Sequence, residues 1–174
     1  MGLGLKPAQR RGRHYRLASL AVRRLGSANL LVKGKSEAGF ELSVIAHLQG
    51  SPELRRNMIT QVGAEEVEKI TQARLFGFKH RPDTTIGRDG TAIEIKVVSH
   101  GGSIRELLGQ AIAYRTAYRF VILVMVDETE DREVVRLCGE RNSPESKLLR
   151  GLSREFNIFS IVGPRGQSKN LVFD

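Results

Sequence analysis

Residues 91–98, Thr-Ala-Ile-Glu-Ile-Lys-Val-Val, alternate apolar and charged side chains at their centre. Alternation in a run rich in β-branched residues predicts a strand, because successive side chains point to opposite faces of a sheet. One face should therefore carry Ile93 and Ile95, and the other face should carry Glu94 and Lys96. Along the strand the two charged residues should lie about 6.6 Å apart.

The residues before this strand predict a hairpin. The run Arg-Pro-Asp-Thr-Thr-Ile (81–86) leads into Gly-Arg-Asp-Gly (87–90), and Asp-Gly between two β-rich runs is a strong hairpin signal. Turn formation is the simplest role for Asp89. Asp83, on the first strand of the hairpin, can then lie beside Glu94.

Two carboxylates and a lysine on strands built for burial would be costly without compensation. A divalent cation would remove that cost, and Mg²⁺ or Mn²⁺ takes carboxylate and carbonyl oxygens as ligands. Asp83, Glu94 and the carbonyl of Ile95 are the expected ligands. Lys96 could hold or deprotonate a water molecule beside them. The alternative is a surface salt bridge between Glu94 and Lys96, which would be worth little.

The remaining patterns predict an α/β fold. Residues 120–126 are apolar on both faces, as in a buried central strand. Ser103 with Glu106 matches a capping box. The cluster at 65–68 favours another helix start, although residues 63–73 are ambiguous. The expected elements are a helix over 37–49, a short helix opened by Ser51 and Pro52, the hairpin, a helix over 103–118, a strand over 120–126, a helix over 144–156 and a strand over 158–162. Helices would cover both faces of a mixed sheet in three layers.

The positive charge is concentrated at the N-terminus. The chain has 28 Lys and Arg against 19 Asp and Glu, and nine of the basic residues, but no acidic one, lie in residues 1–36. We therefore expect a basic arm over 1–36 and a charge-balanced domain over 37–174. The stretch 17–25 has rough helical spacing, so part of the arm could be helical.

Such an arm has three interpretations. It could bind nucleic-acid phosphates, it could be an organelle-targeting segment, or it could be a solvated tail. We favour phosphate binding, through Arg10, Arg11, Arg13 and Arg16. The single cysteine excludes a disulfide framework within the chain and a thiolate-rich metal site, and it suggests an intracellular, cytoplasmic protein. No apolar run is long enough to span a membrane.

The Pro82-Asp83 and Glu94-Ile95-Lys96 elements resemble the PD and ExK motifs of the PD-(D/E)xK, or restriction-endonuclease-like, nucleases. Gln110 and Tyr114, four residues apart on the following helix, resemble the QxxxY motif of the branch that contains lambda exonuclease and the RecB nuclease domain. The helix over 37–49 is similar to the first helix of this family, which often supplies an acidic residue. Glu41 fits that role better than Glu37.

The resemblance covers roughly residues 36–130. It implies a three-layer α/β/α fold with a central mixed sheet, dependence on Mg²⁺, and cleavage of DNA in preference to RNA. It adds Gln110 and Tyr114 to the catalytic set and Glu41 to the metal ligands. A solvated helix face is the alternative explanation for Gln110 and Tyr114.

We therefore expect a Mg²⁺-dependent deoxyribonuclease, acting as an endonuclease, with homodimerisation as a way to cut two strands. A non-catalytic nucleic-acid-binding or assembly protein that retains the fold is the alternative. Metal binding that depends on Asp83 and Glu94 would separate the two hypotheses.

Overall fold

The computed structural model describes residues 4–32, 35–60, 71–166 and 169–174, without the side chain of Glu37. The helices are α1 (Gly12–Gly26), α2 (Glu37–Gln49), α3 (Pro52–Arg55), α5 (Gly101–Arg115), the short 3₁₀ helix η1 (Glu130–Arg132), α6 (Glu133–Gly139) and α7 (Pro144–Phe156). The strands are β1 (Met58–Thr60), β2 (Ala73–Leu75), β3 (Phe78–His80), β4 (Thr84–Ile86), β5 (Thr91–Val98), β6 (Phe120–Asp127), β7 (Ile158–Gly163) and β8 (Leu171–Phe173).

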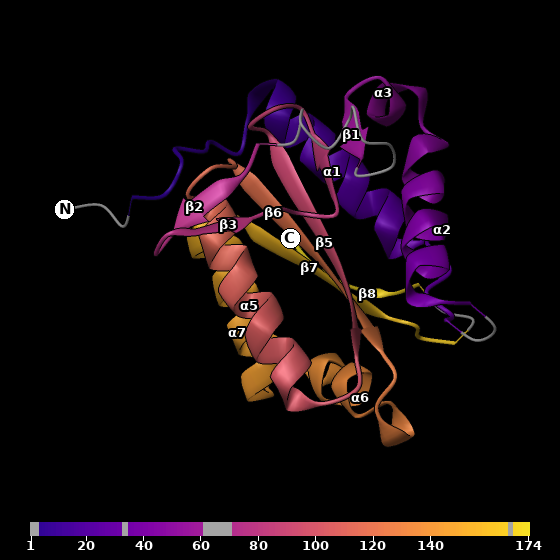
Figure 1. The fold of residues 1–174 in the computed structure, drawn as a ribbon. Coiled ribbons are helices and arrows are strands. Elements are labelled where there is room, and N and C mark those ends of the chain that lie inside the picture. Colours follow the sequence, from indigo (N-terminus) through magenta and orange to yellow (C-terminus); the bar gives the residue numbers. More distant parts are fainter. Residues whose placement is uncertain (1–3, 33–34, 61–70, 167–168) are drawn as a thin grey trace.

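A mixed sheet forms the centre of the fold (Figure 1). Within the described residues it has six strands in the order β1-β4-β5-β6-β7-β8. Strands β5, β6 and β7 pair in parallel, whereas β4 pairs antiparallel with β5, β1 antiparallel with β4, and β8 antiparallel with β7. The hairpin β2–β3 forms a separate two-stranded sheet. Every residue of β6 is buried, which confirms the predicted central strand.

Helices cover both faces of this sheet, so the predicted α/β architecture with a mixed sheet is confirmed. Helices α1, α2 and α3 pack over one face, on a core that includes Ile93 and Ile95. Helices α5, α6 and α7 pack over the other, on a core that includes Leu123 and Met125. The two cores follow from strand alternation, because neighbouring residues of β5 and β6 contribute to opposite faces.

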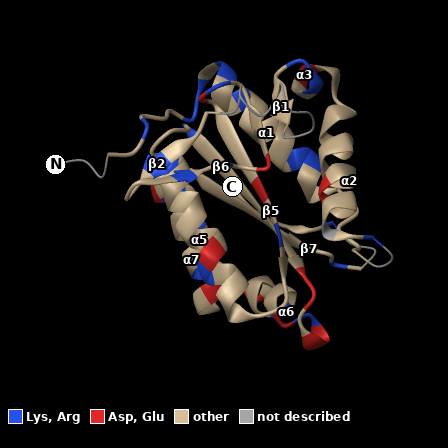
Figure 2. Ribbon diagram, in the orientation of Figure 1, with Lys and Arg blue, Asp and Glu red and all other residues tan. Residues whose placement is uncertain are grey.

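Helix α1 belongs to the first of these cores. Its buried residues follow the spacing of an amphipathic helix, and they are Leu17, Ala18, Ala21, Val22 and Leu25. The predicted helical part of residues 1–36 is therefore present, and the expected boundary at residue 36 does not divide the hydrophobic core. Figure 2 shows Lys and Arg gathered near the start of α1 and at α3, with Asp and Glu gathered around α6.

Several predicted starts are confirmed, and one is wrong. Ser36, Ser51 and Ser143 cap α2, α3 and α7 through their hydroxyl oxygens. Helix α5, however, begins at Gly101, not at Ser103. Its N-cap is His100, whose ring nitrogen accepts from the Gly102 N–H at 3.1 Å.

Other elements were not predicted, namely β1, β2, β3, α6 and β8. All four of these strands are only three residues long and sit at sheet edges or in the small sheet, where the apolar pattern is weak. The predicted helix start at 65–68 lies outside the described residues. Among the helices that are described, none is long and apolar enough to cross a membrane.

Candidate metal and nucleic-acid site

The β4–β5 hairpin places Asp83 opposite Glu94. Thr84 pairs with Ile93 in the antiparallel register. Asp83, which directly precedes β4, therefore lies level with Glu94, which follows Ile93 in β5. The Ile95 N–H donates to Asp83 Oδ2 at 2.7 Å. The Asp83 carboxylate thus bonds a backbone group of β5 just where the pairing with β4 ends, and this fixes its position beside Glu94.

Glu94 is a buried carboxyl group with several partners. Its side chain is 7% exposed. The Tyr114 hydroxyl donates to Glu94 Oε2 at 2.9 Å, and the Asp83 N–H also donates to this carboxylate. Burial raises the pKa of Glu94, and the charge of Asp83 raises it further, to about 8 despite the opposing hydrogen bonds. Two carboxyl groups that share this site resist carrying two negative charges.

Helix α5 presents a polar row to the same face of β5. Glu106, Gln110 and Tyr114 follow one another at intervals of four residues, so they lie on one side of the helix. Glu106 meets Lys96 and Tyr114 meets Glu94. The predicted pairing of Glu94 and Lys96 on one strand face is therefore present, as is a helix side bearing Gln110 and Tyr114.

Gln110 occupies the middle of this row. Its Oε1 atom is buried and has no hydrogen-bond partner within the described part of the chain. A buried amide oxygen without a donor costs free energy. Its place, one helical turn from both Glu106 and Tyr114, means that a water or a ligand between α5 and β5 could supply the missing donor.

Lys96 lies on the face of the site but contacts the helix. Its ammonium group is 3.3 Å from Glu106 Oε2, and the two side chains are 28% and 55% exposed. An ion pair this exposed is weak. Lys96 can therefore exchange Glu106 for another anion at small cost.

The donor set fits a magnesium ion. In the ranges that the structure describes, no three His, Cys, Asp or Glu side chains are grouped so that they could hold a metal ion. Mg²⁺, however, is commonly held by one or two carboxylates, with water and substrate phosphate completing its shell. Asp83, Glu94 and the Ile95 carbonyl suit that pattern, because a divalent cation would offset the repulsion that raises the Glu94 pKa.

The first-helix acid is less closely defined. Glu41 is half-buried on α2, whose residues Phe40, Val44 and Leu48 belong to the core on the Ile93 face of the sheet. Its place among the metal ligands remains a prediction. The side chain of Glu37 lies outside the described part of the structure.

The four arginines predicted to bind phosphate differ in their contacts. Arg10 donates to Asn157 Oδ1 at 3.0 Å and to the Ser153 carbonyl, and its guanidinium lies over a phenyl ring of β7. It ties the N-terminal segment to the body of the protein. Arg11 donates to Gln9. The remaining pair, Arg13 and Arg16, donate to Asn57 and Glu53 and line an open hollow of about 650 Å³ together with Arg56.

Two participants were not predicted from the sequence. Glu106 entered only as the end of a capping box, although its spacing of four residues before Gln110 placed it on the same helix side. Arg81 contributes its backbone carbonyl, which lies 3.0 Å from the Tyr114 hydroxyl, and its Nε is buried without a partner among the described residues. No pattern in the sequence marked the Arg81 carbonyl as a partner of Tyr114.

Comparisons with protein-family models, with curated proteins and with solved structures found no match to this chain.

Proposed function

We propose that this chain is a metal-dependent deoxyribonuclease of the PD-(D/E)xK type that hydrolyses phosphodiester bonds as an endonuclease. The observation that carries the proposal is the pair of adjacent carboxyl groups, Asp83 and Glu94, with Tyr114 bonded to Glu94. The mixed sheet with helices on both faces supports a restriction-endonuclease-like fold. The order of hairpin, helix and buried strand agrees with it.

Each residue has a proposed role. Asp83, Glu94 and the Ile95 carbonyl would hold Mg²⁺ or Mn²⁺. Tyr114 orients the Glu94 carboxylate through its hydroxyl group. When bound, the cation would neutralise charge on the phosphate and lower the pKa of the attacking water.

Lys96 and Gln110 act on the attacking water. Lys96, released from Glu106, stabilises the extra negative charge of the transition state as an ammonium group, or takes the proton of the water after first giving up one of its own protons to solvent. The Gln110 Oε1 atom accepts a hydrogen bond from that water. The water oxygen forms a bond to phosphorus, one phosphorus–oxygen bond breaks, and the leaving oxygen takes up a proton from solvent.

A cleavage panel tests the proposal. Full-length protein is incubated with supercoiled plasmid, linear duplex, branched DNA, single-stranded DNA and RNA, each with Mg²⁺, with Mn²⁺ and with EDTA. We expect cleavage of DNA with metal and none with EDTA. Asp83→Asn and Lys96→Ala should abolish it, and the exposed control variants Glu155→Gln and Lys147→Ala should cleave like wild type. Equal activity of wild type and Lys96→Ala on every DNA would contradict the catalytic role.

One observation favours the second candidate, a non-catalytic nucleic-acid-binding or assembly protein. Lys96 is paired with Glu106 instead of with the carboxylates of the site. Calorimetric titration of the protein with Mg²⁺ separates the nuclease from the non-catalytic binding protein. Binding that disappears in Asp83→Asn and Glu94→Gln supports the nuclease, and the absence of such binding supports the second candidate.

A further inference from the structure

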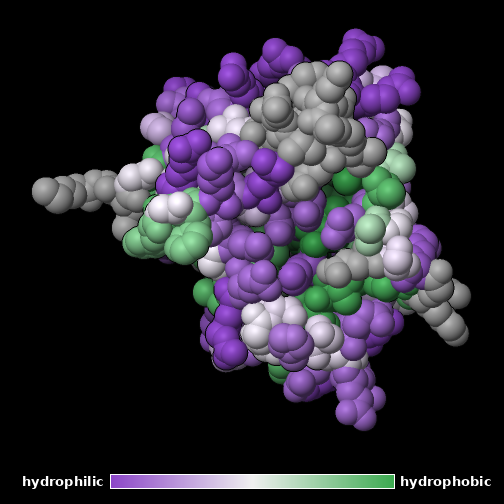
Figure 3. All heavy atoms as spheres, viewed as in Figure 1, coloured by the Kyte–Doolittle hydropathy of each residue, from purple (hydrophilic) through white to green (hydrophobic). Residues whose placement is uncertain are grey.

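The β2–β3 hairpin exposes two phenyl rings. Phe76 is 91% exposed and Phe78 is 71% exposed, and these are the largest exposed fractions among the large apolar side chains of the described residues. A single exposed apolar residue is ordinary, but two aromatic rings at one turn form a patch. Figure 3 shows this patch as a pale green projection bordered by hydrophilic residues.

The backbone of this turn is strained. Phe76 has a φ of 52° and Gly77 has a φ of 82°, and these two residues connect paired Leu75 and Phe78. Glycine adopts such a conformation freely, but a bulky residue does so at a cost, and Asn, Asp or Gly is usual at the first position. A phenylalanine therefore occupies a position where folding alone favours a smaller residue.

The hairpin also places like charges opposite each other. Arg74 pairs directly with Lys79 across the two strands, and both are exposed. Like charges at opposed positions destabilise a sheet. The segment 71–82 contains a further basic residue, Arg81, and no acidic residue. The hairpin therefore combines two exposed rings with cations that have no acid in their own segment.

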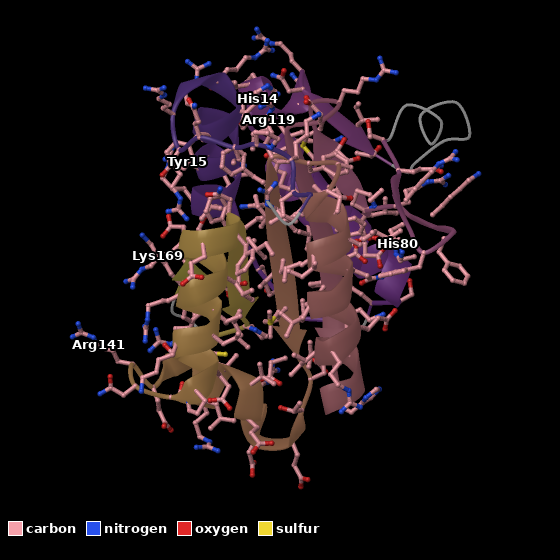
Figure 4. The ribbon with its side chains drawn as sticks, turned by 90° about the vertical axis from the view of Figure 1, so that its left-hand side faces the viewer. His14, Tyr15, His80, Arg119, Arg141 and Lys169 are labelled. Carbon is pink, nitrogen blue, oxygen red and sulfur yellow. The ribbon has the colours of Figure 1, made fainter. Side chains whose placement is uncertain are left out.

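The hairpin lies close to the proposed metal site. Phe78 precedes Asp83 by five residues, so their Cα atoms are at most about 18 Å apart. Ala73, in the other strand, is buried in the core under α5, and this fixes the hairpin to the helix that carries Tyr114. Figure 4 shows His80, the last residue of β3, beside α5 on the side away from α7.

We propose that this hairpin is a binding element for unpaired DNA bases, which stack on Phe76 and Phe78 while Arg74 and Lys79 contact the phosphates. The proposal rests on the proposed function, in that DNA is the substrate. Aromatic rings among cations are the combination that binds single strands, because every base offers a flat face and every nucleotide carries a negative charge. Paired bases in a duplex have no exposed face to offer.

Bound DNA would compensate for two of the unfavourable features of the hairpin. Phosphates would neutralise the opposed Arg74 and Lys79, and bases would cover the exposed rings. An unpaired stretch held there would place a phosphodiester bond a few nucleotides away at Asp83. The nuclease would then favour single-stranded or branched DNA, or duplex with a frayed end, over fully paired DNA.

Binding measured without metal tests this separately from cleavage. Fluorescence anisotropy of labelled oligothymidine and of a duplex of equal length is recorded in EDTA with full-length protein. Phe76→Asn removes one ring and suits a positive φ, and Phe78→Thr removes the other and suits a strand. We expect each change to weaken oligothymidine binding roughly 5- to 150-fold, as for the loss of one stacked base. Binding to duplex should change less than twofold.

Matched variants separate stacking from general hydrophobicity and from charge. Phe78→Tyr should bind like wild type, and Phe78→Leu should bind like Phe78→Thr. Leu148→Ser, which removes an exposed apolar side chain on α7, should change nothing. Arg74→Ala should lower the slope of log affinity against log salt by about 0.7 for single-stranded DNA. Thermal unfolding of Phe76→Asn at or above the wild-type temperature excludes misfolding.

Three outcomes would overturn the inference. They are unchanged oligothymidine binding in the Phe76→Asn, Phe78→Thr double variant, an equal loss of duplex binding, and ring-dependent binding of vesicles rich in anionic lipid with no effect on DNA. If the double variant bound oligothymidine like wild type and still cleaved DNA with metal, the proposed nuclease function would hold but the hairpin would have no role in binding. If binding depended on the two rings but the wild-type protein never cleaved DNA, the hairpin would be a DNA-binding element and the proposed nuclease function would fail.

Discussion

The two faces of β5 differ sharply although their residues alternate along one strand. Ile93 and Ile95 point into the core beneath α1 and α2, and their neighbours there are apolar. Glu94 and Lys96 point toward α5, where they meet a hydroxyl group and a carboxylate. The Ile93 and Ile95 face is stabilised by the burial of apolar side chains. On the other face, Glu94 and Lys96 are stabilised by specific polar partners.

The next strand shows that the fold does not require this polar face. All eight residues of β6 are buried, and apolar side chains of β6 serve both cores. Burying the Glu94 carboxyl group on β5 costs desolvation that hydrogen bonds only partly return. Glu94 and Lys96 are therefore the residues of β5 that the proposed function uses. Replacing either should change the proposed activity more than stability, whereas replacing an apolar residue on the opposite face should change stability more than activity.

The largest effect on stability is expected on the apolar face. Ile93 is fully buried, and Ile93→Ala would remove apolar contacts and leave a cavity, so it should lower the free energy of unfolding by about 2–5 kcal/mol. Urea denaturation measures this, with Glu155→Gln as a surface control. At a temperature where the variant stays folded, its Mg²⁺ affinity should match wild type. A loss below about 1 kcal/mol would mean that this face is not the tightly packed one.

These two faces also mark what the sequence could and could not predict. Alternation in TAIEIKVV assigned each side chain of β5 to its face, and Asp-Gly located the hairpin that brings Asp83 beside Glu94. These predictions succeeded because local spacing determines them. The ion pair of Lys96 with Glu106 joins an exposed helix side to a strand, and the strand alone does not reveal which acid lies opposite.

The predicted start of helix α5 was wrong for a related reason. Ser103 and Glu106 have the letters of a capping box, but His100 supplies the cap and Glu106 turns to Lys96. Likewise, the Arg81 carbonyl became a partner of Tyr114 through tertiary packing. The apolar spacing at 17–25 predicted a helix within the basic stretch at 1–36, but the charge pattern did not indicate that this helix, α1, packs into the core.

The next effect concerns the titration of Glu94. Its pKa is raised from 4.5 to about 8 in the folded protein, mainly by burial, so the folded state retains a proton that the unfolded state releases. The stabilising effect is full below about pH 4.5 and is lost as pH rises to about 8. Each unit of difference corresponds to roughly 1.4 kcal/mol, so the total decline is on the order of a few kcal/mol.

Urea denaturation across this pH range checks the prediction. Glu94→Gln cannot ionise, so its stability should decline less than that of wild type between the two pH values. At about pH 8, Mg²⁺ should raise the free energy of unfolding of the wild-type protein, because it binds the folded state. It should leave the free energy of unfolding of Glu94→Gln unchanged. Parallel pH profiles of the two proteins would show that Glu94 is not held protonated by its surroundings.

A smaller effect is expected from the hydroxyl group that orients Glu94. Tyr114→Phe removes a hydrogen bond to a buried carboxyl group, and its cost should be about 1–2 kcal/mol of unfolding free energy. Because that hydrogen bond lowers the Glu94 pKa, the variant should titrate at a higher pH. Loss of such an orienting partner weakens metal binding roughly 10- to 100-fold, measurable by calorimetry. Tyr15→Phe on α1 is the matched control and should leave Mg²⁺ affinity unchanged.

The smallest effect on stability, and the sharpest separation from activity, is expected at the ion pair of Lys96 and Glu106. Both side chains are partly exposed, so Lys96→Ala and Glu106→Gln should each lower the free energy of unfolding by about 0.2–1 kcal/mol. Their cleavage rates should differ, because Lys96, unlike Glu106, is proposed to act on the water. Glu106→Gln should cleave at or above the wild-type rate, since it frees the ammonium group, and Lys96→Ala should not cleave. If Glu106→Gln lost activity as fully as Lys96→Ala, the ion pair itself would be the functional unit and Lys96 would be a positioning residue.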